Sequence, residues 1–197
     1  MRKSVKWRAC VHEMVCYIGA VRIGENRYGM LPHRIPRLIA TAALMTLALP
    51  SMANDFPLAD KVIVEKENRK LHLLKDGEPF RTFDIALGIA PIGDKEQEGD
   101  FKTPEGVYEL DARNPDSDYF LSIRISYPDA RDRREAATRG VDPGGQIMIH
   151  GQPNEPNYSA AYYRTSDWTN GCIAVSNSDM IDIWLMTPNN VPIEILP

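Results

Sequence analysis

Apolar and polar residues alternate in short runs through most of the chain after residue 60. The run Lys61-Val62-Ile63-Val64-Glu65 is rich in β-branched residues, and Asp76-Gly77 supplies a two-residue hairpin turn soon after it. Alternation with a period of two is typical of strands that bury one face. The pattern therefore predicts a mainly β domain, with strands over residues 61–65, 71–74, 80–87, 106–110, 120–125, 146–149, 171–175 and 191–196.

Two segments have helical character instead. Residues 128–139 combine many charged side chains with good helix formers, so they predict a short exposed helix. Ser176-Asn177-Ser178-Asp179 provides N-cap side chains for a second helix that runs through Met186. The face that we expect this helix to bury carries Ile181, Trp184 and Leu185. The expected fold is one mixed domain, mainly β with short helices, over residues 58–197.

The front of the chain has the order of a secretory signal. Residues 38–49 carry no charge, Arg34 and Arg37 precede them, Pro50 ends the run, and small residues lead to Ala53. A membrane anchor is the alternative, but a span needs about 20 apolar residues and this run is shorter. We therefore expect export and cleavage after Ala53, which makes the mature protein periplasmic or secreted.

Residues 1–29 do not fit a signal, which normally begins close to its basic region. Met30 is a natural start, so we interpret residues 1–29 as an upstream mis-start or extension and residues 30–53 as the signal peptide. In either case Cys10 and Cys16 are absent from the mature protein. The cysteine that remains, Cys172, is then an unpaired thiol in an oxidising compartment, which suggests a reactive group.

Charge excludes several classes of function. Residues 1–53 carry 8 basic and 2 acidic side chains, whereas residues 54–197 carry 15 and 25. Nucleic acids and anionic membrane surfaces need clustered Lys and Arg, so neither is expected as a partner of this acidic body. One cysteine and two histidines without ligand spacing do not make a zinc site, and no metal or other cofactor is expected.

The segment Thr169-Asn170-Gly171-Cys172-Ile173 is the best candidate for chemistry. A glycine before a nucleophile allows a substrate to approach the backbone closely. A catalytic thiol also needs a nearby base, and His150 ends an apolar strand just before a glycine. Taken singly, a cysteine beside apolar residues is most often a buried structural thiol. His72, by contrast, is interpreted as a surface or hydrogen-bonded residue.

Two ordered motifs carry a resemblance to a known family. Ile149-His150-Gly151 followed by residues 169–173 resembles the signature of the L,D-transpeptidase (YkuD-domain) family, and Gly99-Asp100-Phe101-Lys102-Thr103-Pro104-Glu105-Gly106-Val107-Tyr108 resembles a second family segment. The resemblance covers about residues 60–196. It implies the β-sandwich or barrel-like catalytic fold of that family. In the second motif, Thr103-Pro104-Glu105-Gly106 is expected to fix a turn, with its acidic side chain in solvent.

The resemblance also implies an activity on peptidoglycan tetrapeptide stems. Cys172 would be the nucleophile, His150 the general base and acid, and backbone N–H groups at Gly171 and Cys172 the oxyanion donors. A thioester would then be resolved by an amine, which forms 3–3 cross-links or attaches another amine acceptor. Two alternatives stay open: a carboxypeptidase or amidase that hydrolyses the same thioester, and a wall-binding module without turnover.

Substrate-binding residues are less well defined by the sequence. Trp168, Thr169, Asn170 and Arg164 are candidates, and turn chemistry explains Thr169 and Asn170 equally well. Many family members have His at the position of Asn170 and Arg at the position of Ala174. If the family arginine holds a substrate carboxylate, that role has moved in this chain, and Arg124 and Arg164 are the candidates for it.

Overall fold

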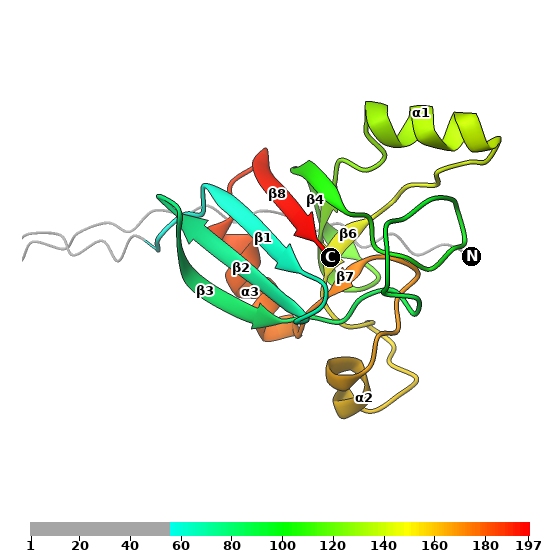
Figure 1. Ribbon diagram of the computed structural model, residues 1–197. Coiled ribbons are helices and arrows are strands. Elements are labelled where there is room, and N and C mark those ends of the chain that lie inside the picture. The colour runs from blue at the N-terminus through cyan, green and yellow to red at the C-terminus, as the bar shows by residue number, and fades with distance from the viewer. Residues whose placement is uncertain (1–55) are drawn as a thin grey trace, which may run out of the picture. The chain divides into compact units, whose positions relative to one another are not determined.

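The computed structural model describes residues 56–197 (Figure 1). The expected signal peptide, its cleavage after Ala53 and the mis-start at residues 1–29 lie outside the described residues. Eight strands form one mixed sheet in the order β3-β2-β1-β8-β4-β5-β6-β7. The strands are β1 (Lys61–Glu65), β2 (Lys70–Lys75), β3 (Glu78–Asp84), β4 (Gly106–Ser117), β5 (Phe120–Ile125), β6 (Met148–His150), β7 (Ile173–Ala174) and β8 (Val191–Leu196).

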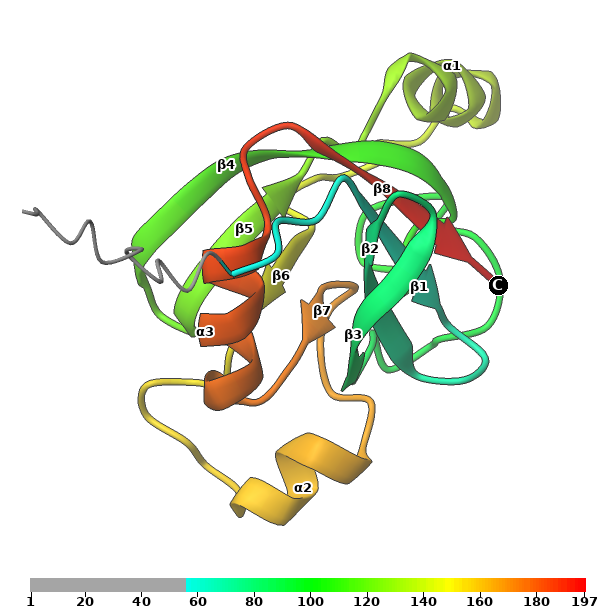
Figure 2. The ribbon, with the colours of Figure 1, turned by 90° about the vertical axis from the view of Figure 1, so that its left-hand side faces the viewer.

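The sheet curls until its two edge strands meet (Figure 2). Just after β3, Ala86 exchanges two backbone hydrogen bonds of 2.8 Å with Ala174 of β7. The pairs β1–β8 and β6–β7 are parallel, and the other neighbours are antiparallel. This closure confirms the expected class, which is mainly β with a barrel-like sheet. Its consequence is that β7, which follows Cys172, is paired on both sides.

Three short helices connect the strands: α1 (Ala130–Arg139), α2 (Ala160–Thr165) and α3 (Asn177–Met186). The expected cap of α3 is present, because Ser176 accepts the Asp179 N–H, and α1 has a cap that was not predicted, in which Asp129 accepts N–H groups of its first turn. Helix α2 was not predicted from the sequence. Within residues 56–197, no helix has the length and apolar character that crossing a bilayer requires.

The predicted buried face of α3 is wrong for Ile181 and Leu185, although Trp184 packs against the core as expected. Met180, Ile183 and Met186 are buried in the core, whereas Ile181 and Leu185 are 43% and 53% exposed. These three buried residues recur at intervals of three and form the face with which α3 packs on β5. The error arose because the apolar residues of this helix surround most of its circumference, so periodicity alone did not select one face.

Candidate active site

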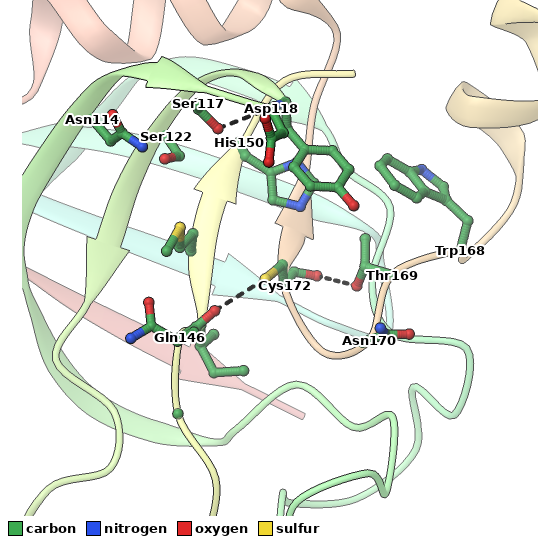
Figure 3. Close-up of a pocket in the computed structure, with 14 residues that line it drawn as sticks. Asn114, Ser117, Asp118, Ser122, Gln146, His150, Trp168, Thr169, Asn170 and Cys172 are labelled. Atoms are coloured by element: carbon green, nitrogen blue, oxygen red, sulfur yellow. Dashed lines mark hydrogen bonds between the residues drawn. The ribbon is translucent and has the colours of Figure 1, made fainter. Parts of the chain in front are cut away.

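A cavity of about 460 Å³ lies over the β5–β6–β7 end of the sheet (Figure 3). Cys172 and His150 both line it, together with the predicted Trp168, Thr169 and Asn170. Strand register explains why the thiol and the imidazole share this cavity. Ile149 pairs with Ile173 across β6 and β7, and both side chains are fully buried in the core. Neighbouring side chains along a strand point to opposite faces, so His150 and Cys172 both face away from the core.

The turn before Cys172 depends on a glycine. Gly171 has a φ of 125°, and a Cβ built there would lie 2.6 Å from the Lys102 carbonyl oxygen. Thr169, which is 4% exposed, holds the same turn. Its hydroxyl donates to the Cys172 carbonyl at 2.7 Å and accepts the Gly171 N–H at 3.1 Å. Thr169 therefore has a structural role as well as its place in the cavity lining.

Replacing Gly171 by Ala is expected to lower the free energy of unfolding by about 1–3 kcal/mol for the strained φ, with a further loss for the collision with Lys102. Gly77→Ala is the matched control. Gly77 also has a positive φ, of 84°, but nothing lies within 4 Å of its built Cβ. Denaturant unfolding of both variants tests this explanation, and an equal or smaller loss for Gly171→Ala would contradict it.

His150 is held in one tautomer by its neighbour. Its Nδ1–H donates to the Gly151 carbonyl oxygen at 2.7 Å, so the neutral ring carries its free lone pair on Nε2. The side chain is buried between aromatic rings, with its centroid 4.7 Å from that of Tyr119 and 5.6 Å from that of Trp168. Burial lowers the pKa of His150 from 6.5 to about 4, against the Gly151 hydrogen bond that raises it. His150 is therefore neutral at physiological pH and can accept a proton.

The Cys172 thiol donates to the Gln146 carbonyl oxygen at 3.5 Å (Figure 3). Burial raises the pKa of Cys172, while a hydrogen bond from the Met148 backbone and the positive charge of Lys95 act in the opposite direction. With the thiol pKa raised and the imidazole pKa lowered, the resting pair is a neutral thiol and a neutral imidazole. A thiol in this state must lose its proton before the sulfur can attack a carbonyl group, and His150, which lines the same cavity, is the candidate acceptor.

The backbone donors differ from the expected set. The Gly171 N–H already donates to Thr169, so it is not free to stabilise an oxyanion in this arrangement. Within residues 56–197 the Cys172 N–H has no hydrogen-bond acceptor. An unpaired N–H on the residue that carries the thiol is well placed for negative charge that develops on an attacked carbonyl oxygen. Cys172 itself is therefore the better candidate donor.

The two candidate arginines lie elsewhere. Arg124 projects from β5 into solvent and pairs with Asp111 at 2.8 Å. Arg164, on α2, lines a separate cavity with Asp84 and Ala174. The structure does not bring either guanidinium to the cavity of Cys172. His72 is also remote: its Nδ1 contacts the Thr82 hydroxyl at 2.9 Å, as expected of a hydrogen-bonded surface residue.

Several lining residues were missed by sequence reasoning. Asp118 and Tyr119 come from the β4–β5 hairpin, and Ser122 lies on β5 opposite His150. Strand 120–125 was predicted, but its neighbour in the sheet was not, and only that pairing brings Ser122 to the site. Among residues 56–197, no group of three His, Cys, Asp or Glu side chains is arranged to hold a metal ion.

The second motif forms the wall behind the Gly171 turn. Asp100 accepts the N–H groups of Glu96, Gln97 and Lys102 and pairs with Lys95 at 2.7 Å. Although burial opposes ionisation, these hydrogen bonds lower the pKa of Asp100. The expectation of a solvated acid is wrong for Glu105, whose carboxylate lies 2.7 Å from the Nζ of buried Lys66. The motif is thus a rigid support for the turn.

Most of the described chain is similar to a known protein family. The family model described as YkuD, L,D-transpeptidase catalytic domain, matches residues 59–195. YafK of Escherichia coli K12, which carries the name of an L,D-transpeptidase, is 39% identical over 92 residues, covering 44% of this chain and 35% of YafK. The crystal structure of the helical cell shape determining protein Pgp2 from Campylobacter jejuni superposes with a TM-score of 0.55 at 28% identity, covering 68% of this chain and 46% of Pgp2. The chain thus spans less than half the length of these relatives.

Proposed function

Because the chain belongs to the L,D-transpeptidase catalytic domain (YkuD) family, we propose that it is an exported cysteine L,D-transpeptidase that acts on peptidoglycan tetrapeptide stems. The observation that carries the proposal is the placement of Cys172 and His150 on one face of adjoining strands, in one cavity. The name of YafK, and the description of Pgp2 as a helical cell shape determining protein, support an activity on the cell wall. Such a substrate lies outside the cytoplasm, in the periplasm or beyond it.

The first half of the reaction forms a thioester. The Cys172 sulfur attacks the carbonyl carbon at the L-centre of the third stem residue, a diamino acid, while Nε2 of His150 takes the thiol proton. The carbonyl oxygen becomes an oxyanion that the Cys172 N–H stabilises. When the intermediate collapses, the bond to the terminal D-alanine breaks, and His150 returns the proton to the leaving amine.

The second half resolves the thioester. An amine from a second stem attacks the thioester carbonyl, His150 accepts a proton from that amine, and the Cys172 sulfur leaves as the thiol. The product is a 3–3 cross-link, or an attached molecule when another amine serves as acceptor. Water in place of the amine gives a carboxypeptidase or an amidase with the same two residues, because these outcomes differ only in which acceptor reaches the thioester.

The proposal is tested by incubating the purified full chain with disaccharide-tetrapeptides and analysing the products by mass spectrometry. Cross-linked dimers are the expected result, and they must be absent with Cys172→Ala. Tripeptides without dimers would replace the transpeptidase assignment with a carboxypeptidase. Unchanged substrate that nevertheless binds would indicate a wall-binding module and contradict the proposed enzyme.

A further inference from the structure

Ser122 is a buried hydroxyl without a partner. It is 2% exposed, it lines the cavity of Cys172, and its Oγ has no hydrogen-bond partner among residues 56–197 (Figure 3). On β5 it pairs in register with His150, so the two side chains stand side by side on the face away from the core. A buried hydroxyl without a partner costs free energy, and a ligand group that hydrogen-bonds to it removes that cost.

The charge of the cavity favours a cation. No Lys or Arg of the described chain lines it, and His150 is neutral. Asp118 supplies the one acidic side chain of this lining, and it is exposed to solvent. Within residues 56–197 its carboxylate has neither an ion-pair nor a hydrogen-bond partner. Asp118 also lines the adjoining cavity of about 620 Å³, where Glu155 adds a second negative charge and no cation is present among the described residues.

We infer that the β5 end of the cavity binds a primary ammonium group on the side chain of the acylating stem residue, with the Asp118 carboxylate and the Ser122 hydroxyl as its acceptors. An ammonium group has three N–H donors and no acceptor, which matches these two side chains, whereas a carboxylate there would lie beside the negative charge of Asp118. The inference rests on the proposed function for the identity of the peptide.

The distance across the sheet from β7 to β5 supports placing the ammonium group at the β5 end of the cavity. Strand β5 lies two positions from β7, which is about 10 Å at the usual strand spacing. A long side chain on the stem residue whose acyl group Cys172 carries spans that distance past His150. An acceptor amine, by contrast, must reach the thioester unprotonated, and a carboxylate partner favours its protonated form. The subsite therefore fits the donor side chain.

The test measures binding without turnover, by calorimetry on the full chain carrying Cys172→Ala. Two synthetic tetrapeptide stems are compared, one with a free side-chain amine at the third residue and one with that amine acetylated. We expect acetylation to weaken binding about tenfold, the range of a charge-assisted hydrogen bond that is partly exposed. Adding Asp118→Asn should remove most of this difference. Asp116→Asn, an exposed acid in the same hairpin that lines neither cavity, should preserve it.

Ser122→Ala provides the second measurement. It should weaken binding of the free-amine peptide severalfold without lowering the midpoint of thermal unfolding, because the hydroxyl has no partner to lose. Equal affinity for the two peptides, a difference that survives Asp118→Asn, or no binding of either peptide would overturn the inference. Failure of the proposed function is read separately, from the absence of products with the unmodified chain.

Discussion

Replacement of Cys172 by Ala is expected to lower the rate of product formation from tetrapeptide stems by about 10⁴-fold or more, as for loss of a nucleophile in other acyl-transfer enzymes. The fold should survive, because the thiol makes only weak contacts, a 3.5 Å hydrogen bond to the Gln146 carbonyl and a hydrogen bond from the Met148 backbone. Chromatography of the products measures the rate, and thermal unfolding provides the control. An alanine variant that keeps a hundredth of the activity would show that the sulfur is not the nucleophile.

Replacement of His150 by Gln should lower the acylation rate by about 10²- to 10⁴-fold, the usual contribution of a positioned general base. Glutamine keeps a polar side chain in the buried position between Tyr119 and Trp168, but it cannot take the thiol proton at neutral pH. The rate of thioester formation in a single turnover measures this effect directly. A loss of less than tenfold would mean that another group accepts the proton.

The pH dependence of the unmodified enzyme follows from the same residue. Because burial lowers the pKa of His150 to about 4, kcat/KM should stay level from pH 8 down to about 5 and fall only as His150 becomes protonated near pH 4. An inflection near 6.5 would contradict a desolvated imidazole.

The lowered pKa of His150 also makes the free energy of unfolding depend on pH. Between pH 6.5 and 4 the unfolded chain binds the proton that folded His150 excludes, so the free energy of unfolding decreases as pH falls through that window.

The sequence predicted the strands of this domain well because most of them bury one face. Val62 and Val64 are fully buried while their neighbours are not, and the Asp76-Gly77 turn has the two positive φ values of a tight hairpin, 53° and 84°.

Cys172 and His150 were identified as candidate site residues from residue types at strand ends. Their common face depends on the β6–β7 register, which no local pattern contains.

What the sequence did not predict depends on contacts between distant segments. The closure between Ala86 and Ala174 and the pairing of Ser122 with His150 both join residues far apart in the chain. The predicted strand 106–110 continues to Ser117 with register shifts, because pairing with β5 holds residues whose own pattern is irregular. For the same reason the hairpin residue Asp118 and its place in the cavity could not be predicted.

The most direct test of the proposed chemistry is the intact mass of the full chain, quenched in acid within the first turnovers on a tetrapeptide stem. The expected result is an added mass equal to the stem without its terminal D-alanine, located on the peptide that contains Cys172 and absent from Cys172→Ala. Cross-linked product without any such adduct, or an adduct on a different residue, would contradict a thioester on Cys172.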